Sequence, residues 1–211
     1  MTKRYRKFKL PFMKGLFKIF VKFMLLSCLS SAFFASCATT GSSAEKQTPA
    51  VYVTNLRKVN ILTTDKIENP VDEVQLFQGS FADNVFSVPL YIQADKDGLN
   101  IAILNDFGTS LGELSYNGTS VHFDSALFPE NIKAEYIVWD FQLAYYRPEE
   151  ISQLLSKHKL SFSVEKDEAS EVRIIMDDHS VIESVLIKKN FIEIKNFLRG
   201  YEYTLTGAGD E

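Results

Sequence analysis

The stretch Gly98–Phe123, GLNIAILNDFGTSLGELSYNGTSVHF, contains two strand patterns, a loop and a turn in succession. Leu99, Ile101 and Ile103 fall at every second position, which places them on one face of a pleated strand. After the loop a second alternating run leads to Asn117-Gly118, a pair that favours a type I′ hairpin turn, and the alternation then resumes. The stretch therefore predicts antiparallel strands joined by short connections.

The loop between the first two of these strands, Asn105–Thr109, has a large apolar residue at its tip. Phe107 stands between Asp106 and Gly108, where polar residues would be easier to hydrate. An exposed Phe107 would be a contact point. Alternatively its ring folds back over the edge of the sheet, since single apolar residues at a surface are common.

The period of two recurs in both halves of the chain. It runs from Val74 to Ala94 before the opening stretch, and it returns from Leu160 to Leu205. Most of the connections are short, so the strands should be antiparallel and the sheet strongly curved. The pattern predicts a mainly β (α+β) fold, a curved antiparallel half-barrel of about nine to eleven strands.

Between these two groups of strands the apolar spacing changes to three and four residues. Ile137, Phe141 and Ala144 share one face of a helix predicted over 132–146. Pro148 and the two acids after it are typical of a helix start, so a second helix is predicted to Lys157. A curved sheet leaves an apolar hollow unless something fills it, so we expect both helices to cover the concave face.

The residues expected at this hollow are apolar or aromatic. The cavity candidates are Leu90, Ile92, Ile101, Ile103, Trp139, Phe141 and Tyr145. For the aromatic side chains, core packing is the preferred alternative, because aromatic stripes mostly bury apolar area. Asp140 stands among these aromatic residues, and a buried carboxylate needs a partner. We expect Asp140 to make a hydrogen bond that anchors the helix to the sheet.

The N-terminus has the pattern of a secretion signal. Residues 1–36 contain eight Lys and Arg and no acid, and the apolar run Phe23–Ala35 is too short to cross a bilayer as a helix. The run ends in Phe34-Ala35-Ser36-Cys37, which resembles a lipobox, so we expect Cys37 to be lipidated and preferred over Cys28. Residues 37–50 then read as a flexible tether, and 51–211 as one domain. Met13 is an alternative start that would give the signal an ordinary length.

Removal of the signal changes the charge balance. The whole chain has 23 basic and 27 acidic residues, whereas residues 37–211 have 15 basic and 27 acidic ones, a net charge of −12. This charge argues against nucleic acid as a partner and against electrostatic attachment to anionic lipid surfaces. Membrane residence would rest on the lipid anchor. Only Cys37 remains after the signal, which excludes a disulfide and a cysteine-based metal site.

The run IAILNDFGTSLGELSYNG resembles a segment of LolB, the outer-membrane receptor that takes lipoproteins from a periplasmic carrier. Asn105, Phe107 and Gly108 fit its Asn-Pro-Leu-Gly loop, although Asp106 stands in place of the proline and Phe107 in place of the leucine. A closer resemblance is to a family of uncharacterised predicted outer-membrane lipoproteins with a LolA/LolB-like half-barrel fold. Its further segments match Leu111–Gly118, Ile137–Pro148 and Arg199-Gly200-Tyr201, so the resemblances span Val74 to Thr206.

These resemblances imply a lipid-anchored protein on the periplasmic face of the outer membrane. It would bind and transfer an acylated or lipid-like cargo, with Phe107, Asn105 and Gly108 as the membrane- or cargo-contact loop and a periplasmic carrier protein as a possible donor. The alternative is a structural or assembly lipoprotein that binds a protein partner and transfers nothing. An open apolar cleft would favour the carrier, and a filled core would favour the scaffold.

The sequence gives little sign of catalysis. Gly108–Gly112 matches G-x-S-x-G, but a strand pattern follows Ser110 where a nucleophile elbow needs a helix. Asp177-Asp178-His179 is better explained as a solvated turn than as a set of metal ligands. His122 is expected to face solvent. We therefore expect neither an enzyme nor a cofactor or metal site.

Overall fold

The computed structural model describes residues 48–81, 84–128 and 132–207, all within the compact unit Lys46–Glu211. The predicted signal, Cys37 and all but the last residues of the predicted tether lie outside the described residues. The strands are β1 (Ala50–Tyr52), β2 (Lys58–Asn60), β3 (Val71–Phe81), β4 (Asn84–Ala94), β5 (Leu99–Leu104), β6 (Ser110–Tyr116), β7 (Val121–Ser125), β8 (Ser161–Lys166), β9 (Ser170–Asp177), β10 (Ser180–Lys188), β11 (Phe191–Asn196) and β12 (Tyr201–Gly207). The helices are α2 (Ala134–Tyr145), α3 (Pro148–Lys157) and the short 3₁₀ turn η1 (Thr64–Lys66).

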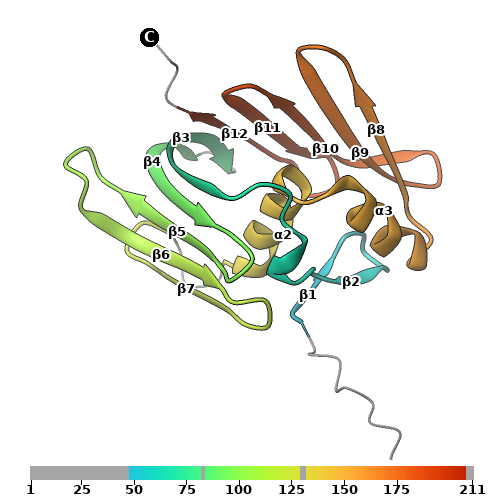
Figure 1. The fold of residues 1–211 in the computed structure, drawn as a ribbon, viewed down its shortest axis with the longest axis horizontal. Helices are drawn as coiled ribbons and strands as arrows, with labels where there is room; N and C mark the ends of the chain where they lie inside the picture. The colour runs from blue at the N-terminus through green and yellow to red at the C-terminus, as the bar shows by residue number, and fades with distance from the viewer. Residues whose placement is uncertain (1–47, 82–83, 129–131, 208–211) are drawn as a thin grey trace, which may run out of the picture. The chain divides into compact units, whose positions relative to one another are not determined.

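Ten of these strands form one antiparallel sheet within the described residues, in the order β7-β6-β5-β4-β3-β12-β11-β10-β9-β8. The sheet curls around α2 and stays open, with β7 and β8 at its edges (Figure 1). β3 pairs with β12, which joins the two groups of strands that the sequence separates by the helices. This arrangement confirms the predicted mainly β fold, a curved antiparallel half-barrel with two helices.

The opening stretch forms β5, β6 and β7 as its alternation predicts. Leu99, Ile101 and Ile103 are buried on the concave face. The predicted type I′ turn is wrong, however, because Tyr116 pairs with Val121 and the connection therefore has four residues. Only Gly118 has a positive φ there, and the Asn117 side chain closes the loop by accepting hydrogen bonds from two later backbone N–H groups.

A second, two-stranded sheet consists of β1 and β2. The alternation in these short runs is too brief to distinguish a strand from a helix. Val51, Val53, Val59 and Ile61 are all buried, so this small sheet contributes its apolar residues to the common core. One of its residues, Tyr52, also contacts α2 through a backbone hydrogen bond to the Tyr136 hydroxyl.

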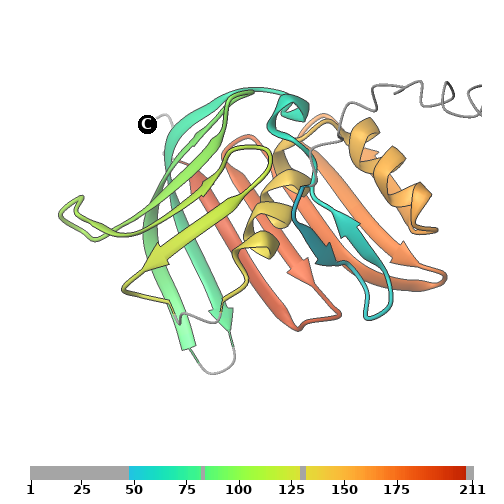
Figure 2. The ribbon, with the colours of Figure 1, turned by 90° about the horizontal axis from the view of Figure 1, so that it is seen from below.

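The two predicted helices are confirmed, but they fill only part of the concave face. α3 lies over β8 and β9, while α2 crosses the middle of the sheet (Figure 2). β1 and β2 lie beside them (Figure 2), and α2 also approaches β7, the edge strand of the other part of the sheet. In the described residues, no helix combines the length and the apolar character needed to span a bilayer.

Arg173 fixes the end of α2. Its guanidinium is buried and donates hydrogen bonds to the carbonyls of Leu143 and Tyr146, 2.9 and 2.7 Å away. These carbonyls lie at the helix C-terminus, where a positive charge is favourable and intrahelical partners are lacking. Glu171 pairs with the same guanidinium at 2.6 Å, so the buried charge is balanced. The position of α2 across the sheet is thereby fixed.

Candidate functional site

An open cavity of about 780 Å³ lies between α2 and the uncovered part of the sheet. Its volume is in the range of pockets that bury most of a drug-sized ligand, about 300–1,000 Å³. The lining comes from β3–β7, α2, β11 and β12 and is mainly apolar. Its apolar residues include Phe77, Phe86, Leu90, Ile92, Ile101, Ile103, Leu114, Phe123, Phe128, Ile137, Phe141, Ile194 and Leu205.

Five of the predicted cavity residues line this space, namely Leu90, Ile92, Ile101, Ile103 and Phe141. The structure places the other two elsewhere. The buried Trp139 is directed to the packed half, where its indole N–H donates to Glu183. Tyr145 stacks on Phe141 and donates its hydroxyl proton to Gln75, so it supports the cavity wall from behind.

The cavity reaches the end of the sheet where β3 ends and β12 begins, and we call this end the mouth. We define it by the lining residues Ser80, Phe128, Lys133, Tyr136 and Arg199. All five line the cavity, and Lys133 is also exposed to solvent. The strand directions place the β3–β4 turn and the β11–β12 turn at this same end, because neighbouring strands are antiparallel.

The β5–β6 loop projects from the side of the sheet (Figures 1 and 2), whereas the β11–β12 turn lies at its lower edge in Figure 2. Phe107 is 93% exposed, so the alternative in which its ring folds back is wrong. The Asn105 side chain accepts hydrogen bonds from the backbone N–H groups of Phe107 and Thr109, at 3.0 and 2.9 Å. Gly108 has φ +75°, which an L-residue rarely adopts. Asn105 and Gly108 therefore shape the loop that holds Phe107 in solvent.

Asp140 anchors α2 to the sheet, as expected. Its carboxylate accepts hydrogen bonds from the Tyr201 hydroxyl at 2.8 Å and the Tyr203 hydroxyl at 3.1 Å, both on β12. Asp140, Tyr201 and Tyr203 also line the cavity. The polar atoms of these three side chains are thus hydrogen-bonded to one another.

A second buried carboxyl, that of Glu183, lies beside Asp140. Burial raises the pKa of Asp140 to about 6, although the two tyrosine hydroxyls favour its ionised form. Burial and the neighbouring Asp140 charge raise the pKa of Glu183 well above its usual range. Glu183 Oε2 accepts the Trp139 N–H, but Oε1 has no hydrogen-bond partner in the described structure. If Glu183 is protonated, this oxygen gains a partner, because its O–H can donate to Asp140.

Arg199 lies at the mouth in the β11–β12 turn. One of its terminal nitrogens, Nη2, donates to the Tyr52 carbonyl and to the Tyr136 hydroxyl, and the guanidinium stacks on the Tyr136 ring at 4.6 Å. The turn itself is closed by Asn196, which accepts the Arg199 backbone N–H at 2.9 Å. The arginine head is therefore held in one place relative to the start of α2.

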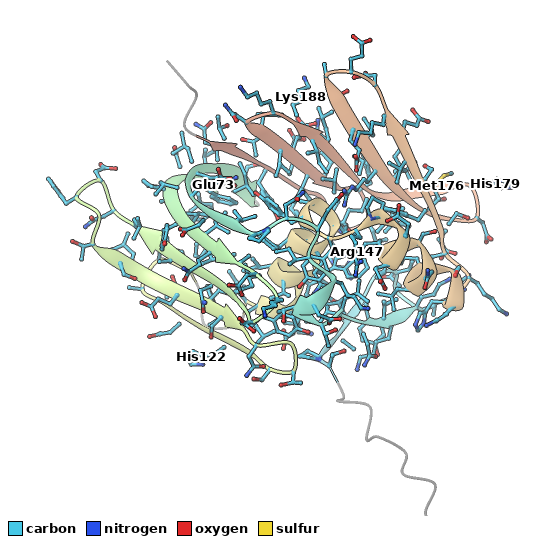
Figure 3. The ribbon with its side chains drawn as sticks, viewed as in Figure 1. Glu73, His122, Arg147, Met176, His179 and Lys188 are labelled. Atoms are coloured by element: carbon cyan, nitrogen blue, oxygen red, sulfur yellow. The ribbon has the colours of Figure 1, made fainter. Side chains whose placement is uncertain are left out.

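The other candidate chemistry of the sequence does not assemble into a site in the described residues. Ser110 begins β6 and donates to the Gly112 carbonyl, without the strand-to-helix turn of a nucleophile elbow. His122 is exposed on β7, far from His179 in the β9–β10 turn (Figure 3). Asp177 pairs with Arg57 at 3.0 Å. No group of three or more His, Cys, Asp and Glu residues with metal-binding geometry occurs in the described residues.

Sequence reasoning missed two residues near the cavity. Glu183 alternates with Val185 and Ile187, so the period of two already places it on the concave face. An acidic residue on this otherwise apolar face could have been recognised as unusual. A bulge at Ile182 then turns Val181 outward, although Val181 stands two residues before Glu183. Arg199 stood out only as part of a family motif, because a turn gives no periodicity from which its direction could be read.

The comparison with known families matches residues 72–208 to a family described as a protein of unknown function, DUF3261. The match begins one residue into β3 and covers the rest of the ten-stranded sheet with α2 and α3, whereas β1 and β2 precede it. No curated protein matches the chain. The matched segment thus contains the cavity, the β5–β6 loop and Arg199, and the chain belongs to the family of proteins of unknown function DUF3261.

Proposed function

We propose that this protein binds the acyl chain of a lipid or acylated protein in its cavity and passes that cargo to the outer membrane, as the resemblance to LolB implies. A lipid anchor at Cys37 would hold it on the periplasmic face. The observation that carries the proposal is the open apolar cavity of about 780 Å³ beside α2. Burial of each methylene of an acyl chain there is worth roughly 0.8 kcal/mol.

The apolar cavity also supports the carrier over the scaffold. A scaffold needs no internal space, and its sheet would be expected to be filled by its own side chains. Here the helices, β1 and β2 fill part of the concave face, while β3–β7, β11, β12 and one side of α2 line an open space that is mainly apolar. This arrangement favours the carrier.

Exposed apolar side chains in or beside three of the strand connections support a contact with lipid. Phe107 is the most exposed of them, Val85 beside the β3–β4 turn is 82% exposed, and Phe197 in the β11–β12 turn is 57% exposed. Such residues cost solvation free energy in water and gain it in a bilayer. The Phe107 loop would enter the lipid first because it projects from the sheet (Figure 2).

The substitution Phe107→Glu tests this role of the loop. Loss of an inserted aromatic side chain, worth about 1.5–3 kcal/mol, should slow delivery of an acylated cargo to acceptor vesicles at least about tenfold. Binding of the cargo by the protein in solution should not change, because Phe107 does not line the cavity.

The matched control is Val164→Glu, which puts the same charge at a partly exposed position on β8, at the far edge of the sheet. Delivery by this variant should equal that of the wild type. Unchanged delivery by Phe107→Glu in the same reconstituted assay would show that the loop does not enter the membrane.

A further inference from the structure

The mouth of the cavity has a different chemistry from its interior. Lys133 and Arg199 both line the cavity at this end, and its deeper walls are mainly apolar. Residues 37–211 as a whole carry 15 basic and 27 acidic residues. The two cations at the entrance of the cavity are therefore opposite in sign to the net charge of this part of the chain. A cavity that ends in such a pair suits an amphiphile whose head differs from its chain.

Arg199 has hydrogen-bonding capacity to spare. Of its five N–H donors, only those on Nη2 have partners among the described residues, namely the Tyr52 carbonyl and the Tyr136 hydroxyl. No Asp or Glu forms an ion pair with it in the part of the chain that the structure describes. The guanidinium is thus held in place while its positive charge and its remaining donors stay available.

The two acids that line the cavity do not occupy Arg199. The Asp140 carboxylate accepts its hydrogen bonds from the tyrosine hydroxyls of β12, and its charge acts on Arg199 only from a distance. The carboxylate of Glu202 faces Lys195, 3.8 Å away. An external anion therefore meets no competing hydrogen-bond acceptor on the guanidinium apart from the Tyr52 carbonyl and the Tyr136 hydroxyl.

Tyr136 adds a donor at the same place. Its hydroxyl oxygen accepts from the Tyr52 backbone N–H at 3.2 Å and from Arg199 at 3.3 Å, and among the described residues its proton has no acceptor. With both lone pairs engaged, the O–H can only donate. Lys133, at the start of α2, adds an exposed ammonium whose charge reinforces that of Arg199.

We propose that the cargo has an anionic head group, a carboxylate or a phosphate, which Arg199, Tyr136 and Lys133 bind at the mouth while its chain lies in the cavity. This inference rests on the proposed function, since it assumes an acyl chain in the cavity. The mouth then selects among amphiphiles of equal length by their charge. Bidentate contact with the planar guanidinium would distinguish these anions from an alcohol.

Photoactivatable probes of one chain length test the selection. Full-length protein in phosphatidylcholine vesicles is irradiated at pH 8 with palmitate, hexadecyl phosphate or hexadecanol, each carrying a mid-chain diazirine, and the label on cavity peptides is quantified by mass spectrometry. We expect at least one of the two anions to label these peptides about tenfold more than the alcohol, as charged hydrogen bonds imply. The two anionic arms decide between a carboxylate and a phosphate.

Variants test whether the mouth residues cause the preference for anionic probes. Arg199→Gln should lower labelling by the preferred anion to the level of the alcohol and leave the alcohol unchanged. Lys133→Gln should lower it about threefold, and this exposed residue can be replaced without disturbing the fold. Lys188→Gln, which removes a charge at the far end of β10, is the matched control and should have no effect.

Equal labelling by all three probes would overturn the head-group proposal and leave the acyl cavity standing. The same holds if Lys188→Gln lowers anion labelling as much as Arg199→Gln, because the effect would then be one of general surface charge. If none of the probes labels a cavity peptide, the proposed function itself is overturned.

Discussion

The carboxyl groups of Asp140 and Glu183 share a buried position between the packed half and the open half of the concave face. Asp140 faces the cavity and the hydroxyls of β12, and Glu183 accepts a hydrogen bond from Trp139 on the packed side. Two ionised carboxylates could not remain together in such a place, so one holds a proton. The pair therefore joins α2 to both β10 and β12.

The raised pKa values give the pair a definite effect on stability. For an acid whose pKa is higher in the folded state, the folded chain binds more protons, so stability falls as the pH rises. For Asp140 this window runs from its ordinary value of 3.8 to about 6, and for Glu183 it begins near 4.5 and extends higher. The lowered pKa of Glu171, which Arg173 causes against the effect of burial, acts in the opposite direction at more acidic pH.

Relative to the wild type, the Glu183→Gln variant should therefore be more stable at high pH than at low pH. The amide keeps a donor for Asp140 and an acceptor for Trp139 but cannot ionise, so the variant should gain free energy of unfolding relative to the wild type between pH 4.5 and pH 8. Urea denaturation at both values measures this gain. A difference between variant and wild type that is the same at both values would refute a raised pKa for Glu183.

The companion variant Glu183→Ala separates packing from titration. It removes the partner of the buried Trp139 N–H and of Asp140, and an unsatisfied buried polar group costs about 1–3 kcal/mol. The loss should be smaller at neutral pH than at pH 4.5, because the variant also lacks the carboxyl whose raised pKa destabilises the wild type as the pH rises.

At the scale of single elements, the β5–β6 loop is an ordered structure with one apolar side chain exposed. The residues before and after it pair as Leu104 with Ser110, and a bulge separates this pair from Ile103 with Gly112. A bulge bends and twists a hairpin, which accounts for its projection from the sheet. The loop can present Phe107 to a membrane because its backbone is fixed by Asn105.

Asn105→Ala tests how much this fixing matters. The two backbone N–H groups of Phe107 and Thr109 lose their acceptor, so their hydrogen exchange should accelerate about fivefold, in line with about 1 kcal/mol for a hydrogen bond. Delivery of cargo should fall less than in Phe107→Glu. Asp106→Ala is the control, since its side chain makes no hydrogen bond in the described structure, and exchange that stays slow in Asn105→Ala would contradict this role of the asparagine.

The sequence predicts most elements of this fold, for reasons that particular residues show. Leu99, Ile101 and Ile103 alternate without interruption, and Pro148 with two acids starts a helix by local chemistry alone. The predicted two-residue turn after Tyr116 is wrong because Asn117 closes a four-residue loop with its side chain. The dipeptide Asn117-Gly118 alone does not determine the pairing register of β6 and β7. The bulge at Ile182 likewise depends on the partner strand and leaves no local signal.

The candidate site was only partly predictable. Alternation correctly brought Leu90, Ile92, Ile101 and Ile103 to one face, but it could not decide which way Trp139 and Tyr145 point. α2 is buried on nearly all sides, since its neighbours are packed residues in one direction and the cavity wall in the other. Only the position of the helix across the sheet, which Arg173 and Asp140 fix, settles which aromatic side chains line the cavity.

For the whole molecule, the uneven filling of the concave face is the feature that matters. α2, α3, β1 and β2 all contribute to one packed core, while β3–β7 keep an apolar wall that faces an open space. An apolar surface of this kind is stabilised by any hydrocarbon that covers it, at roughly 25 cal/mol for each Å² removed from water. The account as a whole rests on this space being filled by acyl chains.

The most direct measurement is the quantity of non-covalently bound acyl groups that remain with the protein after purification from membranes, determined by solvent extraction and mass spectrometry. The account predicts about one bound cargo molecule per wild-type chain, and a loss of at least tenfold in Leu90→Trp, whose indole would fill the cavity. Leu186→Trp, on the same sheet but outside the cavity lining, should keep its cargo. A wild-type protein free of acyl groups, or a Leu90→Trp variant that retains them in full, would contradict the account.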